Sequence, residues 1–335
     1  MNTKKLESWY LEHHVAYPFR QTNHPYHIWV SEIMLQQTQM DTVIPYYERF
    51  IQLFPDIASL AVAHDDLLKK TVEGIGYYRR FKLMKQAAIH MMEKHDGVFP
   101  TLYEDVIKLP GIGTYTAGAI MSIAYGKPYS AVDGNVIRII SRQYLLDQDM
   151  RQEKHKRLIN GINQQLIMHA NPKDYTQALM DLGRTICKPK HPQCELCPVA
   201  ETCQAYASSR QEQLPFLSKL NQTKSLSYIV LIIHTRTGIV LRKRTESLLE
   251  GMYEYPQFEY DSIQAVIDLL DQQGVIIDLY DEPVSFKHVF THQTWHMHVY
   301  SCRLIGNKLL DDWQVYRIEN IKKLPMAIAH RKIRG

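Results

Sequence analysis

Residues 108–120, KLPGIGTYTAGAI, decide the fold, because they place a glycine-punctuated turn between two segments with helical patterning. Glycine lets the backbone N–H groups of a turn converge on an anion such as phosphate. Two nucleotide-binding alternatives fail on their context. A P-loop and a dinucleotide fingerprint both follow a strand, whereas the preceding TLYEDVIKL is helical and no Lys-Ser or Lys-Thr pair follows the glycines.

The remaining interpretation is a helix, a turn at Gly111 and Gly113, and a second helix whose N-terminus faces an anion. A phosphodiester backbone suits this arrangement, since such a grip ignores base identity. A turn that only reverses the chain is the alternative. The same Gly-Ile-Gly-x-Tyr pattern occurs in EGIGYYRR, residues 73–80, which predicts a second loop-to-helix turn.

Length and composition describe an ordinary globular protein. The chain has 335 residues, of which 45% are hydrophobic and 22% charged, enough for two or three domains with sizeable cores. The N-terminal sequence has no run typical of a signal peptide, and no segment approaches the roughly 18 apolar residues of a membrane span. We therefore expect a soluble, intracellular monomer without a membrane partner. The net charge of +4 is compatible with nucleic acid but does not require it.

Four of the five cysteines fall in one short segment, CKPKHPQCELCPVAETC. They are Cys187, Cys194, Cys197 and Cys203. A disulfide framework would spread its cysteines over the fold of a secreted chain, so this cluster indicates a metal site. Four thiolates suit either zinc or an iron–sulfur cluster.

Hydrophobic periodicity divides the chain into two parts. Residues 1–186 have apolar residues at three- and four-residue spacing almost throughout, as in DTVIPYYERFIQLF and FKLMKQAAIHMMEKH. We therefore predict a helical domain over residues 1–206, with the glycine hairpin at about 105–122 and the cysteine loop at 187–203. The polar segment 207–225 is predicted to be a linker. Residues 226–335 contain β-runs, as in LSYIVLIIHTRTGIVLRKRTE and HQTWHMHVYSCRLI, around one helix at SIQAVIDLLDQQG, which predicts an α+β domain.

Several motifs in this order resemble one known superfamily. LPGIGTYTAGAI, VDGNV and the cysteine spacing are similar to the helix-hairpin-helix DNA glycosylases, and WVSEIMLQQTQ, GIGYYRR and QALMDLG resemble their MutY-type adenine DNA glycosylases. The resemblance runs through essentially the whole chain. It implies base excision repair: removal of adenine mispaired with 8-oxoguanine or guanine from double-stranded DNA, which Gly111 and Gly113 hold by its backbone.

Glu32 is the first candidate for catalysis. It lies in IWVSEIML among apolar residues, and desolvation raises the pKa of a carboxyl so that its proton remains available for donation. Breaking an N-glycosidic bond requires a proton on the departing base and a positive charge on the sugar, and two carboxylates can divide these tasks. The resemblance assigns Glu32 the role of general acid.

Asp133 in AVDGNV is the second candidate carboxylate, and a turn or helix-capping role is its alternative. The resemblance implies that it stabilises the oxocarbenium-like sugar with support from Asn135 and Tyr115. Endonuclease III-like relatives carry a lysine at the position of Tyr115, and that lysine leads to strand cleavage. Tyr115 therefore predicts a monofunctional glycosylase that leaves an abasic site.

The target base must leave the helical stack before it can react. The resemblance implies that Gln37 and Tyr77 enter or wedge the stack, with Thr38 and Ile75 beside the opposite base. It places Arg20 and Gln177 in the adenine pocket. Phe19 lies where most relatives have tryptophan, so stacking is retained but an indole hydrogen bond is lost.

The resemblance also implies a 4Fe–4S cluster on the four cysteines, with Arg184, Lys188 and Lys190 forming a basic surface beside them. The second domain resembles the MutT-like, Nudix-type domain, but no glutamate-rich Nudix metal box is present in its helix. Nucleotide hydrolysis is therefore not expected. Phe290, Thr291 and His292 lie where the family has a Phe-Ser-His loop that senses 8-oxoguanine.

Two other functions are compatible with parts of the sequence. An endonuclease III-like pyrimidine glycosylase and lyase is disfavoured by Tyr115 and by the second domain. A structural DNA-binding module without enzymatic activity is disfavoured by Glu32 in its apolar setting.

Overall fold

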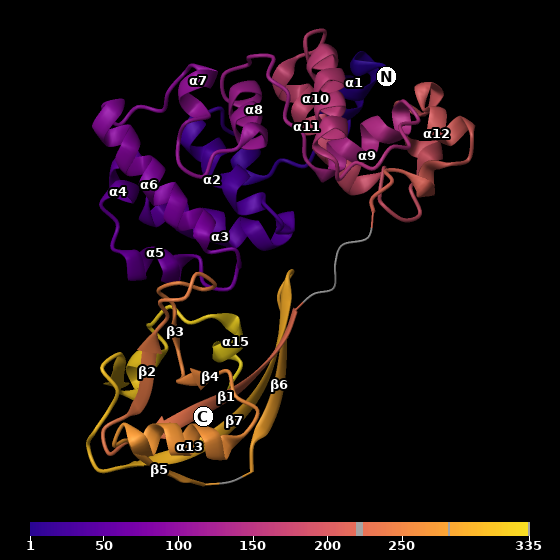
Figure 1. Ribbon diagram of the computed structural model, residues 1–335. Coiled ribbons are helices and arrows are strands. Elements are labelled where there is room, and N and C mark those ends of the chain that lie inside the picture. Colours follow the sequence, from indigo (N-terminus) through magenta and orange to yellow (C-terminus); the bar gives the residue numbers. More distant parts are fainter. Residues whose placement is uncertain (219–223, 281, 334–335) are drawn as a thin grey trace. The chain divides into compact units, whose positions relative to one another are not determined.

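The structure is a computed structural model, and it describes residues 1–218, 224–280 and 282–333 (Figure 1). Two compact units make up the chain. The first comprises Met1–Ala63 and Lys82–Lys219, and the second comprises His64–Phe81 and Leu220–Gly335.

The first unit is helical, as its periodicity predicted, and its described residues contain no strand. Its α-helices are α1 (Thr3–His13), α2 (Pro25–Leu35), α3 (Met40–Leu53), α4 (Ile57–Ala61), α7 (Tyr103–Val106), α8 (Thr114–Ile123), α9 (Gly134–Gln143), α10 (Glu153–Ile167), α11 (Pro172–Thr185) and α12 (Gln204–Ala207). Its short 3-10 helices are η1 (Pro18–Arg20), η2 (Cys194–Leu196), η3 (Ala200–Thr202) and η4 (Gln211–Gln213). Helix α6 (Arg79–Lys94) begins in the segment of the second unit and continues in the first.

One core of this unit lies where α1, α9, α10 and α11 meet. Apolar residues at three- and four-residue spacing, such as Val136, Ile139 and Ile140 in α9, are almost fully buried there. Side chains also fix where the helices begin. Asp133 caps α9, and Asn171 caps α11 by accepting from the N–H groups of Lys173 and Asp174, which satisfies donors that have no partner within the helix.

The second unit is built on one mixed sheet. Its strands are β1 (Lys224–His234), β2 (Ile239–Lys243), β3 (Tyr253–Glu254), β4 (Gln257–Phe258), β5 (Ile276–Leu279), β6 (Val284–Val289), β7 (Gln293–Ile305) and β8 (Trp313–Tyr316). The main strand order is β3-β2-β1-β7-β5, while β4 pairs with β1, β6 with β7 and β8 with β2. The long central strands β1 and β7 are parallel, with a register that runs from Lys224 opposite Gln293 to His234 opposite Arg303.

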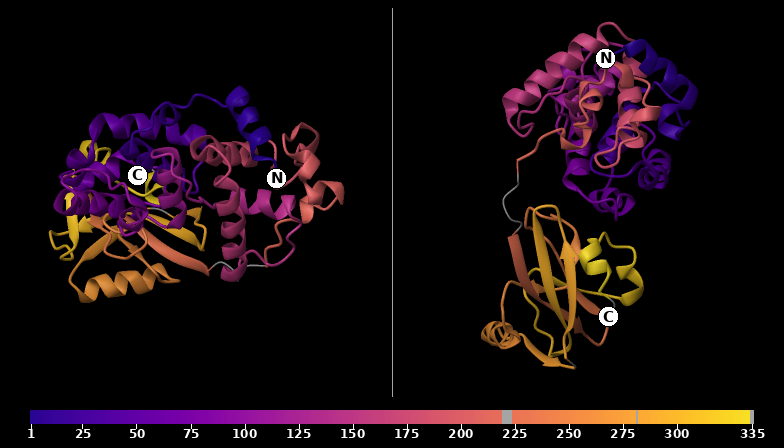
Figure 2. Two further views of the ribbon diagram at one scale, coloured as in Figure 1. Left: turned by 90° about the horizontal axis from the view of Figure 1, so that it is seen from above. Right: turned by 90° about the vertical axis from the view of Figure 1, so that its right-hand side faces the viewer.

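Helices cover both faces of this sheet (Figure 2). Alternate residues of β1 enter different cores, because successive side chains of a strand point to opposite faces. Ile229, Leu231 and Ile233 pack with α13 (Ile263–Gln272). Val230 and Ile232 pack on the other face with the C-terminal segment that contains α14 (Ile318–Ile321) and α15 (Ile328–Arg331).

The sequence predicted the main elements of this unit correctly. The predicted β-runs are β1, β2 and β7, and the predicted helix is α13. The fold class is therefore confirmed: an all-helical body is followed by an α+β domain. The short strands β3, β4, β5, β6 and β8 were not predicted from the sequence.

The predicted domain limits, 206 and 226, stay a prediction, and residues 219–223 of the predicted linker lie outside the described residues. Within that linker, residues 211–213 form η4, and β1 already begins at Lys224. Leu214 is buried, and its carbonyl accepts a hydrogen bond from Arg142 Nε at 3.0 Å, which ties this segment to the first unit. A further difference concerns His64–Phe81, which contain α5 (Asp65–Thr71) and group with the second unit.

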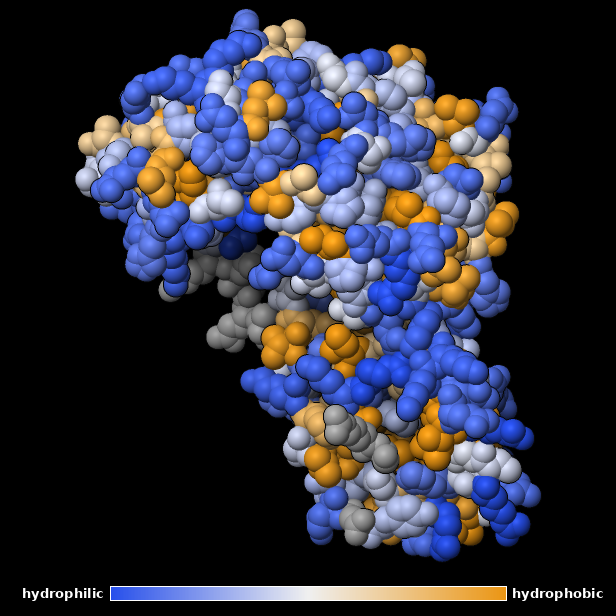
Figure 3. All heavy atoms as spheres, turned by 180° about the vertical axis from the view of Figure 1, so that it is seen from behind, coloured by the Kyte–Doolittle hydropathy of each residue, from blue (hydrophilic) through white to orange (hydrophobic). Residues whose placement is uncertain are grey.

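Most exposed hydrophobic side chains are scattered singly. On the face shown in Figure 3, they lie among hydrophilic residues in both units. Isolated apolar residues of this kind are normal on protein surfaces. In the described parts of the chain, every helix is too short or too polar to cross a lipid bilayer.

Candidate active site

Glu32 lies on α2, a helix whose residues are buried almost all round. Its side chain is 5% exposed, and its Oε2 accepts a hydrogen bond from the Tyr115 hydroxyl at 2.7 Å. Tyr115 comes from the first turn of α8, directly after the glycine hairpin. The hairpin therefore does more than reverse the chain, because it brings a hydroxyl to the buried carboxyl.

Burial raises the pKa of Glu32 from 4.5 to about 7. The Tyr115 hydrogen bond and the positive charge of Arg20 oppose this rise, while the negative charge of Asp133 adds to it. Burial also raises the pKa of Tyr115, and both Glu32 and Asp133 contribute. The largest cause is desolvation, as expected from the apolar sequence around Glu32.

The charge of Asp133 acts on both Glu32 and Tyr115, but the surroundings of Asp133 differ from those of Glu32. It is half-buried at the N-cap of α9, where Oδ1 accepts from the Val136 N–H at 2.8 Å and Oδ2 accepts from Asn135 Nδ2 at 2.8 Å. The dipole at a helix N-terminus favours a negative charge. Asp133 thus caps α9, which was the alternative interpretation of this residue, and Asn135 contacts it directly.

Two glycines allow the loop that carries Asp133 to lie against its neighbours. A Cβ at Gly118 in α8 would lie 2.1 Å from the carbonyl oxygen of Ser130, and a Cβ at Gly183 in α11 would lie 2.6 Å from Asn135 Cβ. Both distances are far below van der Waals contact. Any side chain at these positions would displace the loop or its asparagine.

Arg138 connects this site to the cysteine loop. Its NH2 group donates to Asn135 Oδ1 at 2.8 Å and to the Gly183 carbonyl at 2.8 Å, and its Nε donates to the Cys187 carbonyl at 2.7 Å. A chain of direct hydrogen bonds therefore runs from Asp133 through Asn135 and Arg138 to Cys187.

Arg142 holds the start of the cysteine loop. It is buried and donates to the carbonyls of Lys188 at 2.8 Å and Pro189 at 3.0 Å, and also to Cys187 Sγ at 3.3 Å. These contacts fix the position of the Cys187 sulfur at the start of the loop. Arg184, before the loop, and Lys188 and Lys190, within it, are exposed.

The four cysteines line one shared cavity, together with apolar residues of α9 and α11. Within the described ranges, three or more His, Cys, Asp or Glu side chains nowhere converge closely enough to hold a single metal ion. Four thiolates spread around one cavity fit a larger group, such as an iron–sulfur cluster, better than one tetrahedral zinc. Burial raises the pKa of the Cys197 thiol to about 12. Coordination to a metal deprotonates a thiol outright.

The residues predicted for the adenine pocket are buried in the first unit. Arg20 makes two hydrogen bonds to the Asp181 carboxylate, at 2.5 and 2.8 Å. Phe19 stacks on Tyr17, with ring centroids 5.6 Å apart. Gln177 lies on α11, and its buried Nε2 has no hydrogen-bond partner among the described residues.

The glycine turn lies between two helices, α7 and α8, as predicted. Gly111 has a φ of +77°, a value that favours glycine, and a Cβ there would lie 2.7 Å from Leu83 Cβ. Gly113 is the N-cap of α8, where a Cβ would meet nothing within 4 Å. The first N–H groups of α8 have no partners within the helix. This turn therefore presents an open helix N-terminus.

The residues predicted to read the base opposite adenine are divided between the units. In the first unit, Gln37 is exposed with a φ of +57°, and Thr38 is half-buried. In the second unit, Ile75 is buried, while Tyr77 is 45% exposed with a φ of +50°. A left-handed backbone is unusual outside glycine, and such strain clusters at functional sites.

Thr291 lies in the turn between β6 and β7, with Phe290 and His292 on either side. Its hydroxyl hydrogen-bonds to the Tyr77 hydroxyl. Phe290 packs against Trp295, with ring centroids 4.8 Å apart. The structure thus brings together two of the motifs on which the prediction of opposite-base recognition rests.

Three buried charged residues that contact the candidate site residues escaped sequence analysis. Asp181 and Arg138 are charged residues inside apolar helical runs, ALMDLG and NVIRII, which is the same signal that pointed to Glu32. Arg142 lies one turn beyond Arg138 on α9. A charged side chain on a buried helical face needs a partner, and a search for such positions would have found all three.

Comparison with known proteins places these features in a class. Residues 30–164 match the family model of the HhH-GPD superfamily base excision DNA repair proteins, and residues 228–334 match that of the NUDIX domain. A thermostable thymine-DNA glycosylase of known structure superposes with a TM-score of 0.56 at 25% identity, covering 62% of this chain and 95% of its own. Endonuclease III in a non-covalent DNA complex shares the fold, with a TM-score of 0.51 at 20% identity over 62% of this chain and 94% of its own. The fold and the site define a helix-hairpin-helix DNA glycosylase.

Relatives of known activity narrow this class. The adenine DNA glycosylase of Buchnera aphidicola subsp. Baizongia pistaciae is 33% identical over 310 residues, which are 90% of this chain and 85% of that protein. The human adenine DNA glycosylase is 39% identical over 218 residues, which are 62% of this chain and 40% of that protein. This chain belongs to the adenine DNA glycosylase family.

Proposed function

We propose that this protein removes adenine mispaired with 8-oxoguanine, or with guanine, from double-stranded DNA, and that it leaves an abasic site. The observation that carries the proposal is the pairing of two unlike carboxyl groups around Tyr115. Glu32 is buried with a pKa near 7, and Asp133 accepts two hydrogen bonds at a helix N-terminus. Environments that separate two carboxyl groups in this way assign one as acid and the other as anion.

Glu32 supplies the proton. A carboxyl with a pKa of about 7 is about half protonated at neutral pH, so a substantial fraction of the protein carries the acid, and that acid gives up its proton readily. Protonation of the adenine ring makes it a better leaving group. Tyr115 donates to Glu32 at 2.7 Å and so orients the carboxyl toward the base.

Asp133 stabilises the positive charge that develops on the sugar as the bond breaks. Its hydrogen bonds from Asn135 and the Val136 N–H fix the carboxylate before the reaction, and preorganised charge of this kind needs little rearrangement in the transition state. Tyr115, instead of a lysine, offers no amine to attack the sugar. The expected product is therefore an uncut strand with an abasic site.

The residues proposed to bind adenine and the DNA backbone all lie in the first unit. The unpartnered Nε2 of Gln177 can donate to an acceptor on the base edge. The bidentate pair with Asp181 holds the guanidinium of Arg20 in place, so Arg20 acts through its charge near Glu32, and Phe19 contributes an apolar wall. The open N-terminus of α8 at Gly113 binds a phosphate of the DNA backbone.

Recognition of the opposite base is assigned to two residues of the first unit and five of the second. They are Gln37 and Thr38, and Ile75, Tyr77, Phe290, Thr291 and His292. Tyr77 and Thr291 share a hydrogen bond, which supports a joint role.

The proposal includes a 4Fe–4S cluster that stabilises the cysteine loop. Its ligands would be Cys187, Cys194, Cys197 and Cys203. The shared cavity and the buried Arg142 support it. Iron and sulfide analysis of the purified protein tests the cofactor, and a brown colour separates iron–sulfur from colourless zinc.

The decisive experiment uses a duplex with one A:8-oxoguanine pair. After incubation with the protein, strands should break only when hot alkali is added. Breaks before alkali, or a borohydride-trapped covalent adduct in high yield, would support an endonuclease III-like lyase instead. Binding without any alkali-labile site would leave only a DNA-binding module.

A further inference from the structure

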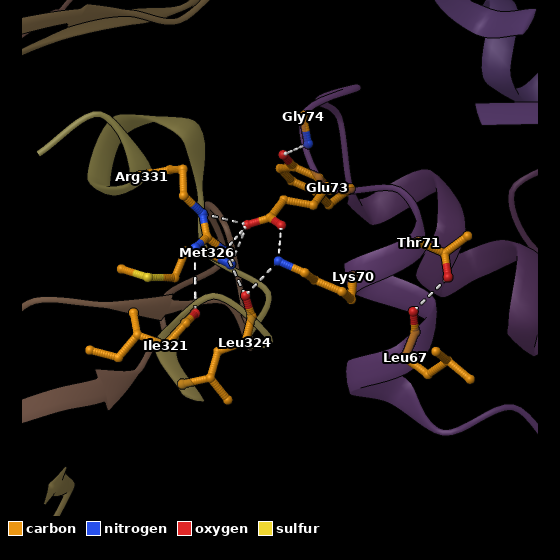
Figure 4. Close-up of polar contacts among 10 residues, drawn as sticks. Leu67, Lys70, Thr71, Glu73, Gly74, Ile321, Leu324, Met326 and Arg331 are labelled. Atoms are coloured by element: carbon orange, nitrogen blue, oxygen red, sulfur yellow. Dashed lines mark hydrogen bonds and ion pairs between the residues drawn. The ribbon is translucent and has the colours of Figure 1, made fainter. Parts of the chain in front are cut away.

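Glu73 immediately precedes the loop that carries Ile75 and Tyr77, and its carboxylate is held by the far end of the chain (Figure 4). Oε1 accepts hydrogen bonds from the Met326 N–H at 2.9 Å and from Arg331 Nε at 3.0 Å. A terminal nitrogen of Arg331 also donates to Oε1. The side chain of Glu73 is only 14% exposed, so water screens these contacts weakly.

Lys70 and Arg331 complete the network. Lys70 Nζ donates to Glu73 Oε2 and, at 3.2 Å, to the Leu324 carbonyl. Arg331 donates to the same carbonyl at 2.7 Å. Two cations therefore share one carboxylate and one backbone oxygen. Several simultaneous contacts of this kind distinguish the cluster from an isolated surface ion pair, which contributes little.

The loop that follows Glu73 needs such support. Gly74 and Gly76 have φ values of +100° and +77°, and Tyr77 has a φ of +50°, although it carries a side chain. Strained residues persist only where their surroundings fix them. Within the loop, the Gly74 N–H donates to the Tyr78 hydroxyl at 2.9 Å. At its far end, Tyr77 hydrogen-bonds to Thr291.

We propose that Glu73 and Arg331 are positioning residues for specificity toward the opposite base. Their clamp fixes the Tyr77 loop to the unit that carries Thr291, so that insertion of Tyr77 and recognition of 8-oxoguanine occur as one event. The inference rests on the proposed function, because it explains how the protein would prefer adenine opposite 8-oxoguanine to adenine opposite guanine. Without the clamp, the loop would move independently of residues 290–292, and the preference for 8-oxoguanine would fall while the chemistry at Glu32 remained.

The test compares Arg331→Ala and Glu73→Gln with the wild type in the full-length protein. Arg331→Lys is a milder variant that keeps the charge but loses the forked contact, in case the alanine variant does not fold. Arg303→Ala is the matched control, because Arg303 belongs to the same unit but pairs at 2.9 Å with the exposed Asp278 on neighbouring strands. Thermal unfolding verifies that each variant is folded.

Two measurements are made on each protein. The first is the dissociation constant and the single-turnover rate constant on duplexes with A:8-oxoguanine and A:guanine. We expect the preference for 8-oxoguanine to fall by about tenfold, the size of coupling common between contacting residues, through binding and with little change in the saturated rate constant. The second is hydrogen–deuterium exchange of the amides in residues 74–78, which should become faster in the clamp variants and stay unchanged in Arg303→Ala.

Unchanged exchange in the Tyr77 loop of folded Arg331→Ala or Arg331→Lys would overturn the inference, as would an unchanged mispair preference. An equal loss of the saturated rate constant on both duplexes would also overturn it, since that result indicates general damage. Failure of the proposed function looks different: the wild type itself would release adenine from neither duplex, while the exchange measurement would still report on the clamp.

Discussion

The hydroxyl of Tyr77 hydrogen-bonds to the hydroxyl of Thr291, a residue 214 positions further along the chain. Both side chains lie in turns: Tyr77 precedes α6, and Thr291 joins β6 to β7. Because His64–Phe81 group with the second unit, these two turns belong to the same compact body. Two motifs that the sequence placed in separate domains therefore form one polar contact.

This contact predicts coupling between the two residues. Tyr77→Phe and Thr291→Ala should each reduce the preference for A:8-oxoguanine over A:guanine, since each removes one hydroxyl of the shared hydrogen bond. The double variant should lose little more than either single variant, with a coupling energy of about 1 kcal/mol. Binding measurements on both duplexes give the full cycle. Additive losses would show that the hydroxyls act separately.

Replacement of the buried acid should abolish turnover. Glu32→Gln keeps the shape of the side chain and its ability to accept from Tyr115 but has no acidic proton. We expect single-turnover excision to fall by roughly 10²–10⁴-fold, the usual contribution of a general acid. Affinity for the mispair, measured by fluorescence anisotropy, should stay close to that of the wild type. Excision at the normal rate would remove Glu32 from the mechanism.

The raised pKa of Glu32 predicts how the rate depends on pH. The proton donor is present below pH 7 and is lost as pH rises through about 7. Single-turnover excision should therefore decline on the alkaline side with an apparent pKa near 7. A rate that stays constant to pH 9 would contradict this assignment.

The same shift predicts a change in stability with pH. In the folded protein the pKa of Glu32 lies above its ordinary value of 4.5, so burial favours the protonated form. The contribution of Glu32 to the free energy of unfolding is therefore fully present below about pH 4.5. It is lost as pH rises through about 7, where the buried carboxyl ionises. At pH 8, Glu32→Gln should therefore unfold with a free energy higher than that of the wild type by on the order of 3 kcal/mol. Equal stability of the two proteins at pH 8 and pH 5 would show that the carboxyl is not desolvated.

Gly183 should resist substitution for a steric reason. In Gly183→Ala the added Cβ would lie 2.6 Å from Asn135 Cβ and push that side chain away from Asp133. We expect a large loss of the single-turnover rate in a protein that still folds. Gly161→Ala on α10 is the control, because nothing lies within 4 Å of the added Cβ. That variant should be about 1 kcal/mol more stable than the wild type and fully active.

Much of the candidate site could be predicted from sequence because its signals are local. The apolar neighbours of Glu32 indicated its burial and raised pKa. The Asp-Gly-Asn sequence indicated a turn or helix cap at Asp133. Glycine spacing foretold the hairpin. In each case a few adjacent residues determine the physical environment, so neighbouring sequence is sufficient.

Other features depend on contacts between distant segments, and these could not be predicted. Nothing in the sequence near Glu73 indicates that Arg331 would bind it, or that residues 64–81 would leave the helical domain and pack with the second unit. The need for glycine at position 118 is also hidden, since it arises from a backbone carbonyl of another segment. Such contacts follow from how the elements pack, which periodicity does not report.

Helix α8 combines two tasks through Gly118. The N–H groups at its N-terminus, beginning at Thr114, have no partners within the helix, and four residues later Gly118 contacts the backbone that leads to Asp133. Four helical residues span about 6 Å. Under the proposed function, the length of α8 would therefore set the distance between the DNA phosphate bound at its N-terminus and the sugar beside Asp133.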